Sequence, residues 1–198
     1  MGITIDYIAG QTPLDDDEKE GLLIDTITTR EELDEFEQQN IEEAVEWTMQ
    51  RQFKTDYILS EEFVFELHKK MFGDVWAWAG TFRKTLKNLG VAPENIGIEL
   101  RKLIDDGNYW ITHKTYSNDE IAIRFKHRIV QIHCFANGNG RHSRLMADVI
   151  AKNIFNRPVF TWGKDNLIHE GNLRSDYLKA LKKADGADMK PLIKFSRG

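Results

Sequence analysis

Most of the chain follows the 3.6-residue repeat of amphipathic helices, and this pattern restricts the fold to a mainly α class. The clearest segment, "TREELDEFEQQNIEEAVEWTMQRQF", opens with Thr29 and Glu32 in capping-box spacing. We expect a long helix there. The residues expected on its inner face are Leu33, Phe36, Ile41, Ala44, Val45, Thr48 and Met49.

Further helix starts are marked by capping residues. Ser60 is a suitable N-cap for a helix that ends at Gly73, and Pro93 suits the first turn of the next helix. Ser117 with Glu120 forms another capping box. Helical spacing resumes in "RLMADVIAKNIF", and the C-terminal region reads as one or two closing helices. The sequence therefore predicts a helical bundle.

One stretch, "WAGTFRKTLKNLGV", departs from this pattern. Thr81, Phe82 and Thr85 favour a strand, whereas Asn88 to Gly90 favour a turn. We expect a small β-hairpin, held by the helices because a lone hairpin is marginally stable. Its outer edge is a candidate docking surface for an extended peptide.

Composition excludes several classes of protein. The net charge of −5 over 198 residues argues against binding nucleic acid through bulk charge. No apolar run is long enough to span a membrane, and the N-terminus lacks signal-peptide features, so we expect a cytoplasmic protein. The single cysteine, Cys134, excludes an internal disulfide and a cysteine zinc cluster.

The stretch "IHCFANGNGRHSR" contains the candidate catalytic and anion-binding residues. Gly138 and Gly140 leave backbone N–H groups bare at the start of a helix, where the helix dipole favours an anion. Arg141 and Arg144 lie three residues apart in the sequence and can add bidentate contacts to phosphate oxygens. This combination predicts a clamp for a polyphosphate.

His133 stands at the end of the preceding helix and can take a proton from a hydroxyl at neutral pH. A base beside a phosphate clamp predicts attack of a nucleophile on phosphorus. Each feature alone is common in structural roles. Seven specified residues within twelve positions, however, match by chance at roughly one start in a billion.

The stretch "HCFANGNGRHSR" resembles the signature of the Fic (Fic/Doc) family, His-x-Phe-x-Asp/Glu-Gly-Asn-Gly-Arg-x-x-Arg, and "WAGTFR" looks like the start of that family's target-docking flap. The resemblance spans about residues 57–195 and implies a Fic-type helical bundle with a β-hairpin flap beside the active-site loop. The segments "TPLDDDEKEGL" and "FTWGKDNL" further resemble a Fic subgroup labelled mobile mystery protein B.

The resemblance implies roles for individual residues. His133 would be the general base, and Phe135 would anchor the loop in the core. Gly138, Asn139, Gly140 and Arg141 would hold the donor's phosphates, with Arg141 also stabilising the developing charge and Arg144 binding the terminal phosphate. The target-docking flap would be formed by Thr81, Phe82, Arg83, Lys84 and Thr85.

Two positions depart from the family signature. Asn137 stands where an acidic residue usually binds magnesium, and a neutral amide oxygen is a weaker ligand for this hard ion, so Asn137 is a weak metal candidate. Cys134 stands where proline is common, and we interpret it as a small packing residue.

Many Fic proteins are inhibited by a helix with the motif Ser/Thr-x-x-x-Glu-Gly/Asn, and the full motif is absent from this chain. Glu20 followed by Gly21 is its best remnant. We therefore hypothesise an inhibitory ion pair between Glu20 and Arg144. A solvated acidic arm is the alternative interpretation.

The resemblance implies a protein adenylyltransferase that moves AMP from ATP to a Ser, Thr or Tyr hydroxyl of a target protein, with Mg²⁺ or Mn²⁺. One alternative is a nucleotide-binding regulatory protein with weak or no transfer. A second is a Fic-fold transferase that uses another phosphate donor. We expect residues 1–55 to form an N-terminal arm and long helix, with a regulatory role as one option, and 56–198 to form the Fic core. The sequence leaves the oligomeric state open.

Overall fold

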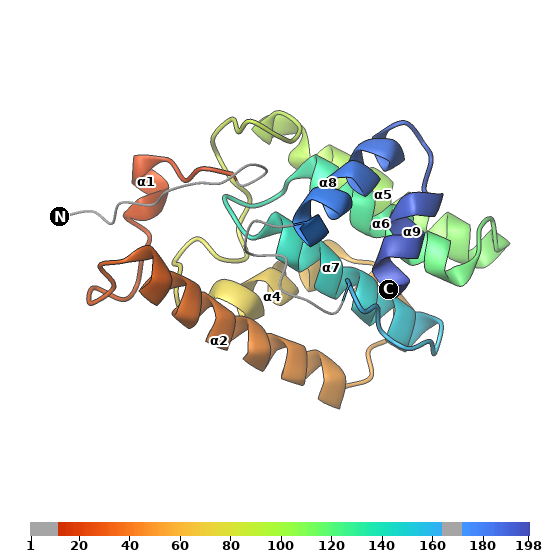
Figure 1. The fold of residues 1–198 in the computed structure, drawn as a ribbon, viewed down its shortest axis with the longest axis horizontal. Helices are drawn as coiled ribbons and strands as arrows, with labels where there is room; N and C mark the ends of the chain where they lie inside the picture. The colour runs from red at the N-terminus through yellow and green to blue at the C-terminus, as the bar shows by residue number, and fades with distance from the viewer. Residues whose placement is uncertain (1–11, 164–171) are drawn as a thin grey trace.

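The computed structural model describes residues 12–163 and 172–198, and its regular elements there are helical (Figure 1). The α-helices are α1 (Asp16–Lys19), α2 (Arg30–Gln50), α3 (Thr55–Ile58), α4 (Glu61–Phe72), α5 (Ile96–His113), α6 (Asn118–Ile132), α7 (Asn139–Val149), α8 (Asn172–Asp185) and α9 (Lys190–Arg197). A 3₁₀ turn, Pro93–Asn95, precedes α5, and a π-helical turn, Ile150–Ile154, extends α7. The mainly α prediction is confirmed.

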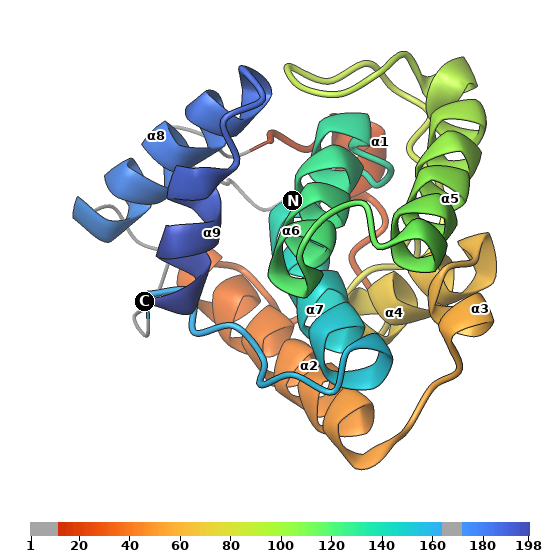
Figure 2. The same cartoon turned by 90° about the vertical axis from the view of Figure 1, so that its right-hand side faces the viewer.

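Helices α6 and α7 lie at the centre of the bundle (Figure 2). Helix α5 packs on one side of α6, and α8 with α9 forms a pair on the other side. Helix α2 runs along α4 at the lower edge in Figure 1. This arrangement places the α6–α7 connection, which is the predicted catalytic loop, deep inside the molecule.

The predicted N-caps are confirmed, but of the two predicted capping boxes only that of Thr29 with Glu32 is complete, because the Glu120 carboxylate bonds to Arg124. The Thr29 hydroxyl accepts a hydrogen bond from the Glu32 N–H at 3.2 Å, while the Glu32 carboxylate accepts from the Thr29 N–H at 3.0 Å. Ser60 caps α4 and Ser117 caps α6 through their hydroxyl oxygens. Pro93 opens the turn that leads into α5.

The inner face of α2 differs from the expected one. Its buried residues are Leu33, Glu37, Asn40, Ala44 and Thr48. Three apolar residues of the expected face, Phe36, Val45 and Met49, are exposed. The helix is rotated because Glu37 and Asn40 have polar partners inside: the Trp76 indole donates to Glu37 at 2.7 Å, and Asn40 donates to the Lys70 carbonyl at 3.0 Å.

The predicted β-hairpin is wrong for the described structure, because the segment from residue 81 to 91 is an irregular loop without strand pairing. Its two ends bond to the α6–α7 connection instead of to each other. The Arg83 N–H donates to the Cys134 carbonyl at 3.0 Å, and the Val91 N–H donates to the Ile132 carbonyl at 3.3 Å. We call this loop the flap segment.

Among the described residues, the β-type pairing lies elsewhere, between Leu22 and Trp76. The Leu23 N–H donates to the Val75 carbonyl at 2.9 Å, and the Ala77 N–H donates to the Gly21 carbonyl at 2.8 Å. This pairing ties the N-terminal arm to the residues that precede the flap segment. Within residues 12–163 and 172–198, no helix combines the length and apolarity needed to cross a bilayer.

Candidate active site

His133 caps the C-terminus of α6 in a left-handed conformation, with φ of 58°. It is buried, and its backbone carbonyl accepts a hydrogen bond from Arg83 Nε at 2.6 Å. The same guanidinium donates to the carbonyls of Thr85 and Val91, so one side chain joins both ends of the flap segment to His133. The predicted base is therefore fixed by its backbone, which leaves the imidazole available for chemistry.

Burial lowers the pKa of His133 to about 4, and the nearby positive charge of Arg83 acts in the same direction, against the opposing effect of the Val130 backbone. The imidazole is thus neutral at physiological pH and able to accept a proton. Its Nδ1 has no hydrogen-bond partner of good geometry among the described residues. Its Nε2 lies 3.1 Å from the Thr12 hydroxyl.

The loop after His133 leads into the N-terminus of α7, where the first N–H groups of a helix lack intrahelical partners. Gly138 has φ of +77°, and a Cβ there would lie 2.5 Å from the Phe72 ring. At Gly140, by contrast, the nearest atom that a Cβ would meet is Arg144 Nη1, at 3.9 Å. Gly138 is required by the turn, while Gly140 keeps the helix terminus open to the pocket.

Asn139 and His68 hold this loop in shape. The Asn139 amide accepts from the Phe135 N–H at 3.0 Å and donates to the Phe135 carbonyl at 2.7 Å, so its side chain closes the loop. The buried His68 ring stacks on Phe135 with centroids 3.7 Å apart. Its Nδ1 accepts from the Gly80 N–H and its Nε2 lies 3.0 Å from the Asn137 carbonyl, which links the flap base to the loop.

The two motif arginines differ in their partners. Arg141 forms an ion pair with the buried carboxylate of Glu37 and lies over the Phe72 ring. Arg144 lies 5.8 Å from the centroid of the Tyr177 ring, whose hydroxyl accepts from buried Lys126 at 2.5 Å. Arg141 is therefore already neutralised by α2, whereas Arg144 is stacked on α8.

A cavity of about 520 Å³ lies beside these groups and brings the predicted residues together. Its lining includes His133, the loop from Asn137 to Arg141, and Arg144. Further lining residues that the sequence had not indicated are Thr12, Arg30, Arg128, Arg174, Tyr177, Leu178 and Leu181. The cavity thus joins a cationic end with an apolar wall contributed by α8.

Asn137 is poorly suited to hold a metal ion in this arrangement. Its Oδ1 accepts from the Gly138 N–H at 2.5 Å and from Arg141 at 3.4 Å, while its Nδ2 donates to the Thr12 carbonyl at 3.1 Å. In the described part of the chain, no group of three or more His, Cys, Asp or Glu side chains has metal-site geometry. The side chains present therefore do not form a metal site by themselves.

The predicted pair between Glu20 and Arg144 is not formed among the described residues. Glu20 is exposed at the end of α1, and the arm is turned so that Glu18 faces the flap segment instead. Glu37 is the carboxylate that reaches a motif arginine. The sequence contained a signal for this role: Glu37 is an acidic residue four positions after Leu33, on the same buried face of α2.

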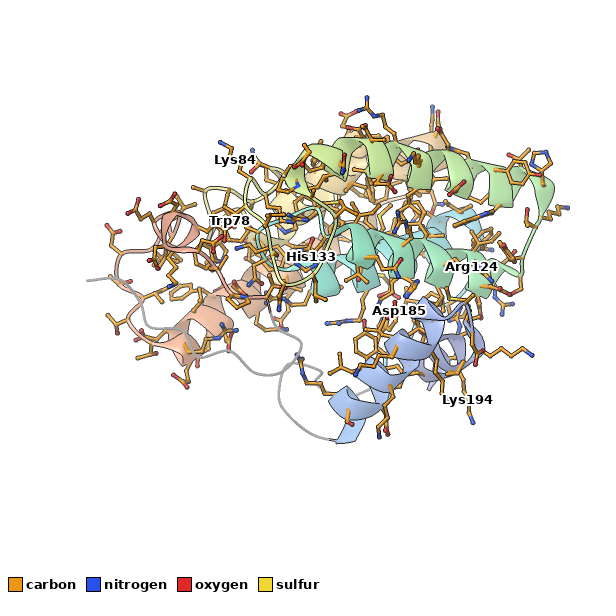
Figure 3. The ribbon with its side chains drawn as sticks, turned by 90° about the horizontal axis from the view of Figure 1, so that it is seen from above. Trp78, Lys84, Arg124, His133, Asp185 and Lys194 are labelled. Carbon is orange, nitrogen blue, oxygen red and sulfur yellow. The ribbon has the colours of Figure 1, made fainter. Side chains whose placement is uncertain are left out.

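The five predicted flap residues have different environments. Thr81 and Lys84 are exposed, Phe82 is partly buried against Phe65, and Arg83 is buried. Thr85 Oγ1 donates to the Glu18 carboxylate at 3.1 Å. In Figure 3 His133 lies between Trp78, at the base of the flap segment, and Asp185 at the end of α8.

Cys134 is completely buried, and this burial raises the pKa of its thiol to about 12. The thiol therefore stays protonated, as expected for a packing residue rather than a nucleophile.

The chain is similar in sequence to proteins of the Fic/DOC family. Residues 58–151 match the model of the Fic/DOC family. "Protein adenylyltransferase Fic" of Nematostella vectensis is 26% identical over 163 residues, which is 78% of this chain and 35% of that protein. The chain thus spans about a third of the length of this curated relative.

Solved structures share the fold. Fic-1 (aa134–508) from C. elegans aligns with a TM-score of 0.65 at 21% identity, covering 90% of this chain and 50% of the other. The BepC protein from Bartonella tribocorum with bound AMPPNP aligns with a TM-score of 0.65 at 17% identity, covering 92% and 97%. Residues 58–151 thus match the Fic/DOC family model, and the solved structures show that the chain shares the Fic fold.

Proposed function

We propose that this protein is an adenylyltransferase that transfers AMP from ATP to a protein hydroxyl. The observation that carries the proposal is the placement of neutral His133, the N-terminus of α7 and Arg144 around one cavity. The adenylyltransferase name of the Nematostella vectensis relative and the AMPPNP bound to the BepC structure support the same activity.

In the proposed reaction, the ATP phosphates lie against the N-terminus of α7, where Gly138 and Gly140 leave the backbone accessible. His133 Nε2 accepts the proton of the target hydroxyl, whose oxygen attacks the α-phosphorus. The bond from the α-phosphorus to the bridging oxygen breaks, and pyrophosphate leaves. Arg141 and Arg144 stabilise the charge on the phosphate oxygens.

The apolar wall of the cavity supports a binding place for the nucleoside. Tyr177, Leu178 and Leu181 come from α8, and Leu89 with Val91 comes from the flap segment. Aromatic and aliphatic side chains stabilise a planar base by contact with its faces. We expect the nucleobase to be adenine, because the relative is named an adenylyltransferase.

The test is intact-protein mass spectrometry after incubation with ATP, a panel of candidate hydroxyl proteins, and either Mg²⁺, Mn²⁺ or EDTA. The expected result is addition of an adenylyl group that depends on His133, with the rate in His133→Ala lower by about 100-fold or more. Exposed His113→Ala is the matched control and should transfer normally. Equal transfer in His133→Ala contradicts the proposed base.

A second candidate function is nucleotide binding without transfer, and the departure at Asn137 favours it. Asn137→Asp supplies a carboxylate for a metal and also removes the donor to the Thr12 carbonyl. If ATP binds with similar affinity to both forms but only Asn137→Asp transfers AMP, the natural chain is a binding protein. A third option, another phosphate donor, is tested by replacing ATP with other nucleotides.

We further propose that a divalent metal binds together with ATP, that the acceptor is a Ser, Thr or Tyr hydroxyl, and that the protein is cytoplasmic. We also propose that residues 1–55 form an N-terminal arm and long helix beside a Fic core of residues 56–198, and that the protein belongs to the mobile mystery protein B subgroup. Residues 1–11 and the end of "FTWGKDNL" lie outside the described residues. An inhibitory role of Glu20 is tested by Glu20→Gly, for which the exposed position predicts unchanged nucleotide affinity.

A further inference from the structure

The hydroxyl of Thr12 lies in contact with the predicted base. Thr12 Oγ1 is 3.1 Å from His133 Nε2, although 121 residues separate the two in the sequence. The Thr12 side chain is buried, and it lines the same cavity as the α7 N-terminus and Arg144. A hydroxyl in this position can donate its proton to a neutral imidazole, which is the arrangement required of an acceptor.

The backbone of the arm is held so that this hydroxyl stays in place. Asn137 Nδ2, from the catalytic loop, donates to the Thr12 carbonyl at 3.1 Å. One residue later, Lys87 Nζ from the flap segment donates to the Pro13 carbonyl at 3.0 Å. The carbonyl groups of Thr12 and Pro13 are therefore held by the catalytic loop and by the flap segment, respectively.

The arm after Thr12 continues along the flap segment. The Lys87 ammonium also pairs with Asp15 at 2.9 Å and with Glu18, and its side chain is buried by these contacts. Thr85 donates to the Glu18 carboxylate, and the Trp78 indole donates to the Glu18 carbonyl at 2.9 Å. The acidic arm thus lies on the surface where the proposed function needs a target polypeptide to lie.

We propose that Thr12 is an acceptor for the protein's own transfer reaction, modified within the same molecule. This inference rests on the proposed function. Thr12 Oγ attacks the α-phosphorus of ATP, its proton passes to His133 Nε2, and the α-phosphorus to bridging-oxygen bond breaks to release pyrophosphate. The product is a phosphodiester in which the former α-phosphate joins Thr12 Oγ1 to the 5′-oxygen of adenosine, so the nucleoside is tethered beside the cavity that bound ATP.

The experiment incubates the full chain with ATP and Mg²⁺ or Mn²⁺, and maps modified peptides by mass spectrometry. We expect an adenylyl group at Thr12 in the wild type, none at this position in Thr12→Ala, and label retained at position 12 in Thr12→Ser. Thr26→Ala is the matched control, because Thr26 is an exposed threonine between α1 and α2. In His133→Ala the rate of labelling should fall by about 100-fold or more.

A mixture of two variants tests whether the reaction is intramolecular. His133→Ala supplies an intact Thr12, and Thr12→Ala supplies an intact His133. We expect no label at Thr12 in the mixture, and in the wild type a rate constant independent of protein concentration. Label in the mixture, or a rate that rises with concentration, overturns the intramolecular assignment.

The remaining outcomes separate this inference from the proposed function. AMP transfer to another residue or to an added protein, dependent on His133 but without label at Thr12, overturns the inference and leaves the proposed function in place. Absence of any His133-dependent transfer from ATP overturns both.

Discussion

Gly90 is the residue that allows the flap segment to pass beside His133. It has φ of +105°, and a Cβ at this position would lie 2.6 Å from the His133 Cβ and 2.7 Å from Arg83 Nη2. A side chain must therefore displace either the base or the guanidinium that holds it. The sequence indicates Gly90 only as a turn residue, because the contact with His133 joins segments that are far apart in the chain.

We expect Gly90→Ala to lower the free energy of unfolding by roughly 1–3 kcal/mol, because a residue with a side chain is strained at positive φ. The contact with His133 should also reduce activity. Urea denaturation measures the first effect, and the transfer assay measures the second. Gly186→Ala is the control, since that glycine is exposed and needs no positive φ. Equal stability of the wild type and Gly90→Ala contradicts the prediction.

At the scale of elements, α2 acts on the site through one carboxylate. Glu37 holds Arg141 in an ion pair, and an ATP phosphate must compete for the same guanidinium. Glu37→Gln keeps an oxygen for the Trp76 indole but removes the negative charge. We expect ATP to bind several-fold more tightly to this variant.

Isothermal titration calorimetry measures the ATP affinity of Glu37→Gln. Glu35→Gln is the matched control, because Glu35 is exposed on the same helix. Unchanged or weaker binding by Glu37→Gln indicates that Glu37 positions Arg141 for the phosphate and does not compete with it.

The arm depends on a second ion-pair cluster, centred on Lys87. Its buried ammonium contacts the Pro13 carbonyl, Asp15 and Glu18, and Lys87→Ala leaves all three groups without this donor. The same hydrogen bond from Lys87 is the largest cause of the lowered pKa of Asp15. We expect faster amide hydrogen exchange over residues 14–22 in Lys87→Ala. Exposed Lys84→Ala should exchange like the wild type, and protection retained in Lys87→Ala would show that the arm is held by other contacts.

The helices and their starts could be predicted from the sequence because capping and apolar spacing are local signals. Thr29, Ser60 and Ser117 act within one turn of their own helices. The flap segment could not be predicted in this way. The backbone N–H groups of Arg83 and Val91 bond to the carbonyls of Cys134 and Ile132, and such long-range hydrogen bonds leave no local pattern.

At the scale of the whole molecule, buried histidines link stability to pH. Burial lowers the pKa of His142 to about 4, and its ring bonds to the Val64 carbonyl at 3.1 Å. The unfolded state, with a pKa near 6.5, therefore binds a proton that the folded state rejects between pH 6.5 and 4. This contribution to stability is complete above pH 6.5 and is lost as the pH falls towards 4.

We expect the free energy of unfolding to fall by up to about 3 kcal/mol over this range because of His142. Urea denaturation at a series of pH values measures the change. In His142→Gln the pH dependence should be shallower, while exposed His113→Gln should retain the wild-type slope. Identical slopes in all three proteins contradict the assignment.

The grouping of the motif residues was predictable from the sequence, whereas their roles stay predictions. His133, Gly138, Gly140 and Arg144 lie around one cavity as expected. Thr12 was missed because it reaches the site through the packing of the arm, which no local pattern marks. Glu37 was missed although its place on the buried stripe of α2 was a local signal, because the sequence does not show which arginine it would meet.

Arg83 fixes the position of His133 independently of the exposed tip of the flap segment. By holding the carbonyls of Thr85, Val91 and His133 together, it fixes the ends of the flap segment while the tip between them projects, with Leu86 75% and Leu89 52% exposed. Substitution of the exposed Leu86 should therefore leave the imidazole in place, unlike substitution of Gly90, where a side chain would meet His133. If the flap segment docks the target, as the resemblance to the Fic family implies, substitutions at Leu86 would change which polypeptides bind while the position of His133 stays the same.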